Sequence, residues 1–218
     1  KQKCFITDAG HELKTPLTII DADAEILTMD FGENEWLSDI QSQTKRLSEL
    51  TNDLILLSRM EEEQTKTQVL DFPLSDIVEE TIQSFQTMAK AQEKTLEISI
   101  QPLISFRGDE KAIRKLVSLL MDNALKYSEP KGKISCVLKQ QKNQIYFSVY
   151  NTTKYISKAQ TPYLFDRFYR TDQSRNSDTG GYGLGLSIAH AIVSSHKGKI
   201  TASTTDEHSL TISVILPL

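Results

Sequence analysis

Hydrophobic residues recur every three to four positions over roughly the first sixty residues of the chain. Two such runs are separated by the turn-forming stretch 30–34, DFGEN. Each run is the apolar stripe of an amphipathic helix, so we expect a helical hairpin. The stripes consist of Phe5, Ala9, Leu13, Leu17, Ile20, Ala24 and Leu27, then of Leu37, Ile40, Thr44, Leu47, Leu50, Leu54 and Leu57.

Two facing stripes make only a thin core. Pairing two hairpins would complete the burial in a four-helix bundle. We therefore expect a homodimer formed through residues 1–63.

From about Thr65 the pattern alternates between helical and strand periodicity. We expect helices that begin with Ser75 as N-cap, at Asp109, and over Leu184–His196. Strict alternation predicts strands at 96–100, 134–138, 145–149, 199–203 and 210–216. The expected fold class is α+β: a hairpin domain at 1–64, then a two-layer α/β sandwich with a mixed sheet at 65–218.

Composition narrows the possible functions. The net charge of -4 argues against nucleic acid as a partner. Two distant cysteines, Cys4 and Cys136, do not make a disulfide framework. No apolar run is long enough to cross a bilayer. The chain begins at Lys1 inside a helical pattern, so we expect it to be a piece of a longer protein.

A histidine lies opposite the apolar stripe of the first predicted helix. In the stretch GHELKTPLT, His11 is about 160° from Ala9 and Leu13 and within about 40° of Thr15, which predicts an exposed ring. The adjacent Glu12 can accept a ring proton and leave the other nitrogen nucleophilic. A solvated surface histidine is the alternative.

Two further segments are suited to phosphate. The glycine-rich stretch DTGGYGLGL at 178–186 opens a helix, where backbone amides can approach an anion. It lacks the spacing of a dinucleotide fold and the lysine of a P-loop. Asn123, Lys126 and Tyr127 share one helix face, where an amide oxygen suits Mg²⁺ and a lysine suits phosphate. A surface loop and a solvated helix face remain the alternatives.

Together these motifs resemble the catalytic core of a sensor histidine kinase of a two-component system. FITDAGHELKTPLT resembles the phospho-acceptor motif, DNALKYS the asparagine motif, LFDRFYR the phenylalanine motif, and GGYGLGLSIA the second glycine motif. The resemblance implies a dimeric helical bundle followed by an ATP-binding sandwich of the gyrase and heat-shock ATPase type. It also implies the cytoplasmic part of a protein anchored in the cell membrane through segments outside this chain.

The resemblance implies a role for each motif residue on the helical hairpin. His11 would accept the γ-phosphoryl group of ATP, with Glu12 as its base. The phosphoryl group would pass to an aspartate of a response regulator receiver domain. Thr15 would position water for dephosphorylating that partner.

The resemblance likewise assigns the nucleotide site in the sandwich. Asn123 would ligate Mg²⁺, and Asn151 would accept a hydrogen bond from the adenine amino group. The remaining nucleotide-binding residues implied are Lys126, Tyr127, Arg170, Gly181, Gly183, Leu184 and Gly185.

Two departures from the family pattern keep a second function open. Thr153 and Tyr155 stand where the family's first glycine motif has glycines, and Asn151 replaces its aspartate. Leu119 stands where an earlier asparagine is usual. The alternative is a non-catalytic dimerisation and docking module with a degenerate nucleotide site.

Overall fold

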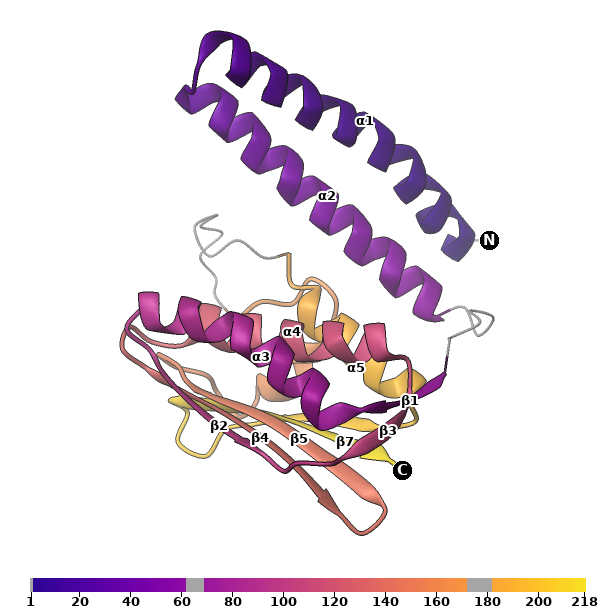
Figure 1. Ribbon diagram of the computed structural model, residues 1–218, viewed down its shortest axis with the longest axis vertical. Coiled ribbons are helices and arrows are strands. Elements are labelled where there is room, and N and C mark those ends of the chain that lie inside the picture. The colour runs from indigo at the N-terminus through magenta and orange to yellow at the C-terminus, as the bar shows by residue number, and fades with distance from the viewer. Residues whose placement is uncertain (1, 62–68, 172–181) are drawn as a thin grey trace. The chain divides into compact units, whose positions relative to one another are not determined.

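The chain forms two compact units, Lys1–Thr65 and Lys66–Leu218, in the computed structural model (Figure 1). The structure describes the backbone of residues 2–61, 69–171 and 182–218. It describes side chains over 12–60, 69–171 and 182–218.

The first unit is the predicted helical hairpin, made of α1 (Gln2–Phe31) and α2 (Glu35–Glu61). The turn is closed by Gly32, whose φ of 81° is left-handed and therefore suits glycine. Asn34 then caps α2, because its Oδ1 accepts a hydrogen bond from the Leu37 amide at 2.9 Å.

One hairpin covers only part of the two predicted stripes. Leu17 and Ala24 of α1 are buried, as are Thr44 and Leu57 of α2. Other stripe residues are substantially exposed: Leu13 at 55%, Ile20 at 45% and Leu27 at 42%, with Ile40 and Leu47 similar. A single hairpin therefore leaves a continuous apolar face without cover from its own two helices.

The second unit is an α/β sandwich with the predicted mixed five-stranded sheet. Its elements are β1 (Leu70–Pro73), α3 (Leu74–Ala91), β2 (Thr95–Ile100), β3 (Ser105–Gly108), α4 (Glu110–Tyr127), β4 (Lys133–Gln141), β5 (Gln144–Thr152), the 3-10 helix η1 (Thr161–Phe165), α5 (Gly185–Ser195), β6 (Lys199–Ser203) and β7 (Ser209–Pro217). The strand order of the sheet is β2-β4-β5-β7-β6, with β2 parallel to β4 and the other pairs antiparallel. Figure 1 shows α3, α4 and α5 together on one face of that sheet.

The sandwich core lies between this sheet and the helices. Alternate residues of the central strands face inward and are buried, including Ile134, Leu138, Phe147 and Val214. Cys136 is among them, and burial raises the pKa of its thiol to about 12.

Asp109 caps α4 as the sequence predicts. Its Oδ1 accepts a hydrogen bond from the Ala112 amide at 3.0 Å. Its own backbone amide donates to Nε2 of His196, the C-cap residue of α5, at 3.0 Å. This bond ties the start of α4 to the end of α5, a long-range link that no local pattern indicates.

The predicted N-cap role of Ser75 is wrong. The cap position of α3 is Pro73, and Ser75 lies inside the first turn without a capping bond. Its buried hydroxyl instead donates to the Gln101 carbonyl at 2.7 Å and accepts from the Ile104 amide at 3.0 Å. A buried hydroxyl needs partners, and the β2–β3 connection supplies both.

The sequence reading also missed β1 and β3, which form a separate antiparallel pair. Four residues each is too short a stretch to show alternation. Among the described helices, none has the length and apolar character to cross a membrane.

Candidate functional site

The predicted acceptor motif lies within a continuous α1. His11 is part of the helix, but its side chain lies outside the described residues. The neighbouring Glu12 and Thr15 are exposed, whereas Leu17 is buried. A shallow hollow beside them is lined by Lys14, Thr15, Thr18 and Ile19. The helix therefore presents the Thr15 and Thr18 hydroxyls to solvent on the face that the 100° rule assigns to His11, with the Glu12 carboxylate exposed on the flank of that face.

The asparagine motif occupies the last turns of α4. Asn123, Lys126 and Tyr127 are all partly exposed, while Ala124 and Leu125 between them are buried. The Lys126 ammonium lies 5.7 Å from the centre of the Tyr127 ring. An amide oxygen and a cation therefore share one accessible face, a donor set that fits a magnesium-bound phosphate.

The second glycine motif contains one position that only glycine suits. Gly183 has φ of 74°, and its carbonyl accepts the Phe168 amide at 3.0 Å. A Cβ at this position would lie 2.8 Å from the Phe168 carbonyl carbon and 2.8 Å from the backbone carbonyl oxygen of Tyr169. The glycine turn is thus closely packed on the segment that follows η1. Gly181 lies outside the described residues.

Gly185 brings this motif next to the asparagine motif. It is the first residue of α5, and a Cβ there would lie 3.6 Å from Leu119 Cδ2, an ordinary contact distance. Leu119 is one helical turn before Asn123, and α4 packs against α5. Leu184, just before Gly185, is buried. Two motifs that are sixty residues apart in the sequence therefore meet where α5 begins.

Asn151 lies in β5 between Ile134 of β4 and Leu210 of β7, and only 2% of it is exposed. Its Nδ2 donates a hydrogen bond to the Thr152 carbonyl at 2.9 Å. This bond fixes the orientation of the amide, with Oδ1 as its accepting atom. The side chain can therefore serve as an acceptor for an amino group, as the resemblance implies.

The residues after Asn151 pair with the turn that precedes β7. The Thr153 amide donates to the His208 carbonyl, and the Ile156 amide donates to the Glu207 carbonyl, both at 2.8 Å. The Tyr155 ring meets the His208 ring edge-on, with centres 6.3 Å apart.

Neither Thr153 nor Tyr155 has positive φ. The missing glycines are therefore accommodated by an extended loop that is held in place by other contacts.

Aromatic residues anchor the segment around η1. Tyr163 contacts Tyr169, with ring centres 6.0 Å apart, and Phe165 contacts His190 of α5 at 5.9 Å. Arg170 is half-buried at the end of this segment. Across the side chains described by the structure, no group of three or more His, Cys, Asp or Glu could hold a metal ion.

The contacts of Leu119 and His208 were not foreseen from the sequence. Both are long-range, because Leu119 contacts α5 and His208 contacts the loop after β5. Hydrophobic periodicity is a local signal and could not have indicated either.

The fold and the site define a class of protein: an ATPase-type α/β sandwich preceded by a helical hairpin that carries a His-Glu pair. Two family models match the chain. Residues 108–218 match "Histidine kinase-, DNA gyrase B-, and HSP90-like ATPase", and residues 1–63 match "His Kinase A (phospho-acceptor) domain". The chain belongs to this family, as the catalytic core of a two-component sensor histidine kinase.

Relatives agree with this assignment. The chain is 35% identical over 218 residues to sensor protein DltS of Streptococcus agalactiae serotype III, covering all of this chain and 55% of that protein. It is 32% identical over 225 residues to sensor histidine kinase RppB of Synechocystis, covering 100% of this chain and 49% of that protein. The chain thus spans about half the length of the relatives it matches.

Solved structures show the same fold. Full-length ShkA in complex with AMPPNP superposes with a TM-score of 0.83 at 18% identity, over 97% of this chain and 45% of that one. Histidine kinase AdeS of Acinetobacter baumannii gives 0.70 at 24% identity, over 95% of this chain and 97% of that one.

Proposed function

We propose that the chain is an ATP-dependent protein-histidine autokinase that phosphorylates His11. The observation that carries the proposal is the meeting of the two nucleotide motifs, where Gly185 at the start of α5 packs beside Leu119, one turn before Asn123. This places a helix N-terminus, an amide oxygen and a lysine on adjoining elements. These are groups that bind phosphate and Mg²⁺.

ATP and Mg²⁺ are the cofactors that we propose. Asn123 would hold the metal ion through its amide oxygen, and Lys126, Tyr127 and Arg170 would lie near the phosphates. The Asn151 side chain would accept a hydrogen bond from the adenine amino group. The nucleotide supplies the transferable phosphoryl group, and this chain supplies positioning and charge neutralisation, the main sources of catalysis in phosphoryl transfer.

His11 is proposed as the nucleophile and Glu12 as the base that takes its ring proton. The exposure of Glu12 supports this role, because the acceptor must be reachable by an ATP-bearing domain. Glu12 would accept the proton from one ring nitrogen while the other nitrogen forms a bond to the γ-phosphorus, and the bond from that phosphorus to the bridging oxygen would break to release ADP.

The test is incubation with γ-labelled ATP and Mg²⁺. We expect acid-labile, alkali-stable label on the parent chain and none on His11→Gln. Asn123→Ala should also lose the label, whereas Asn143→Ala, an exposed amide in the β4–β5 turn, should keep it. An unlabelled parent that binds no nucleotide would instead support the non-catalytic docking module.

We propose a homodimer, supported by the apolar face that one hairpin leaves exposed. We also propose that the phosphoryl group passes to an aspartate of a response regulator receiver domain. Mixing labelled chain with such a domain should move the label to it. Thr15 is exposed, so Thr15→Ala should keep autophosphorylation and slow the loss of label from the receiver domain. Since ATP is cytoplasmic, we propose that compartment for this core.

A further inference from the structure

Helices α3, α4 and α5 lie on one face of the five-stranded sheet, and none of the helices that the structure describes lies over the other, outer face (Figure 1). Near one end of the outer face, four residues form a row across neighbouring strands: Lys139, Tyr146, Ile215 and Lys199. Strands are about 4.8 Å apart, so this row is about 14 Å long.

Two more lysines lie at the same end of the sheet. Lys142 is in the β4–β5 turn, and Lys197 lies two residues before the first residue of β6. We call Lys139, Lys142, Lys197 and Lys199 the lysine end. All four are exposed, and within the described residues none has a carboxylate partner.

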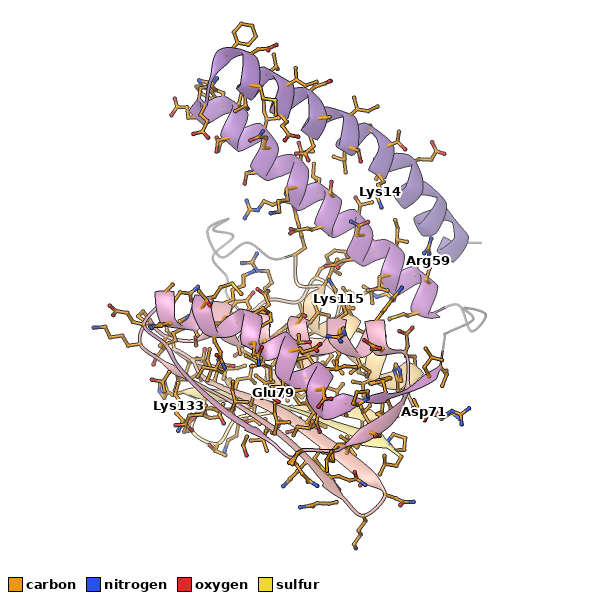
Figure 2. The ribbon with its side chains drawn as sticks, in the orientation of Figure 1. Lys14, Arg59, Asp71, Glu79, Lys115 and Lys133 are labelled. Atoms are coloured by element: carbon orange, nitrogen blue, oxygen red, sulfur yellow. The ribbon has the colours of Figure 1, made fainter. Side chains whose placement is uncertain are left out.

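The opposite end of the same sheet differs in this respect. There Lys133 pairs with Glu97 at 2.8 Å, and Lys131 pairs with Glu93 at 3.4 Å. Figure 2 labels Lys133 at the end of the sheet away from the β4–β5 turn. The positive charge is therefore offset at one end and left uncompensated at the lysine end.

Apolar groups accompany the lysine end. Tyr146 and Ile215 lie between Lys139 and Lys199 in the row. Leu103 is 95% exposed, in the loop that follows β2. This loop lies beside Lys139, because the Gln101 amide donates a hydrogen bond to the Leu138 carbonyl at 2.9 Å. Tyr146 and Ile215 are half-buried, and Leu103 is the most exposed of the three apolar side chains. Lysines beside accessible aromatic and aliphatic side chains suit a membrane surface, where the cations meet anionic headgroups and the apolar groups enter their boundary.

Charge is also divided between the two units of the chain. Residues 1–65 contain 6 Lys and Arg against 14 Asp and Glu, a net charge of -8. Residues 66–218 contain 19 against 15, a net charge of +4. No Asp or Glu occurs between Glu129 and Asp166. The overall charge of -4 thus combines an acidic first unit with a basic second unit.

We propose that the lysine end, together with Leu103, docks on an anionic phospholipid bilayer. The complementary charge is that of the lipid headgroups, and Leu103 would enter the boundary of the acyl chains. The lysines lie along a sheet face and its end, an arrangement that suits an extended charged surface. This inference goes beyond the kinase proposal and does not depend on it.

The test is co-sedimentation of the 218-residue chain with vesicles, without nucleotide. We expect binding to vesicles of phosphatidylcholine mixed with phosphatidylglycerol, no binding to phosphatidylcholine alone, and weaker binding as salt rises. Lys139→Gln with Lys199→Gln should lower the partition coefficient about 25-fold, since each lysine contributes about fivefold. Leu103→Ser should weaken binding at every salt concentration.

The matched control is Lys131→Gln with Lys133→Gln, which removes the same charge from the ion-paired end. This control should bind like the parent chain, and thermal unfolding will show that both double variants are folded. Equal losses in the two double variants would overturn the proposal, as would absence of binding to the anionic vesicles. Binding of poly-glutamate or a DNA duplex as tight as vesicle binding would also overturn it. Histidine labelling is assayed separately, so either proposal can fail alone.

Discussion

Gly183→Ala should loosen the contact between the glycine turn and the segment after η1. Gly183 has φ of 74°, and its carbonyl holds the Phe168 amide at 3.0 Å. A methyl group there would lie 2.8 Å from two backbone atoms of the facing segment. Those atoms are backbone and cannot rotate away, so the segment itself must move.

The expected loss of free energy in the native arrangement of this segment has two parts. Left-handed backbone costs a residue with a Cβ about 1–2 kcal/mol. Displacing the facing segment loses the hydrogen bond to Phe168, about 0.5–1.5 kcal/mol. The sum of about 1.5–3.5 kcal/mol corresponds to a 10- to 300-fold change in the local opening equilibrium at about 1.4 kcal/mol per factor of ten.

Amide hydrogen exchange at Phe168 measures this equilibrium directly, and its protection should fall by that factor in Gly183→Ala. Gly185→Ala is the matched control. Gly185 is helical and a Cβ there meets only Leu119 at 3.6 Å, so stability should stay the same or rise by up to about 1 kcal/mol. Unchanged protection in Gly183→Ala, or an equal loss in both variants, would refute the argument.

Three other predictions concern the core, the adenine acceptor and the dimer. The Cys136 thiol has its pKa raised to about 12 by burial, so the folded state keeps a proton that the unfolded chain loses above about pH 9. Relative to Cys136→Ala, the free energy of unfolding should fall by roughly 1.4 kcal/mol per pH unit between these values, measured by denaturant titration. Asn151→Asp removes the amide group that donates a hydrogen bond to the Thr152 carbonyl, so the free energy of unfolding should fall by about 1–3 kcal/mol. An unchanged denaturation midpoint would contradict this prediction. Ile20→Asp with Leu47→Asp should convert a dimer to monomers in sedimentation velocity, because both apolar side chains are exposed on a single hairpin. A dimer that persists in this variant would show that this face is not the dimer interface.

The elements predicted best are those with a long one-sided pattern. Strands β4, β5 and β7 alternate because one face meets the helices, and α4 begins directly after Asp109 because that side chain caps it. In each case the residues that make the pattern are also the residues that create the structure.

The features that were missed depend on distant residues. Ser75 has the right residue type for a cap, yet its hydroxyl bonds Gln101 and the Ile104 amide. The candidate site was likewise only partly predictable from local sequence patterns. The glycine and asparagine motifs can be found in the sequence, but their meeting through Leu119 is a property of how α4 and α5 pack.

The residues that depart from the family pattern make contacts within the second unit, some of them at its surface. Tyr155 contacts His208, and the Thr153 amide bonds the turn before β7, so this loop keeps its shape through contacts other than those of glycine. Leu119 contacts the start of α5. Since these altered residues contact the protein itself, we expect nucleotide binding to depend most on Asn123 and Gly183. Asn123 is accessible on α4, and Gly183 has the left-handed backbone that its turn requires.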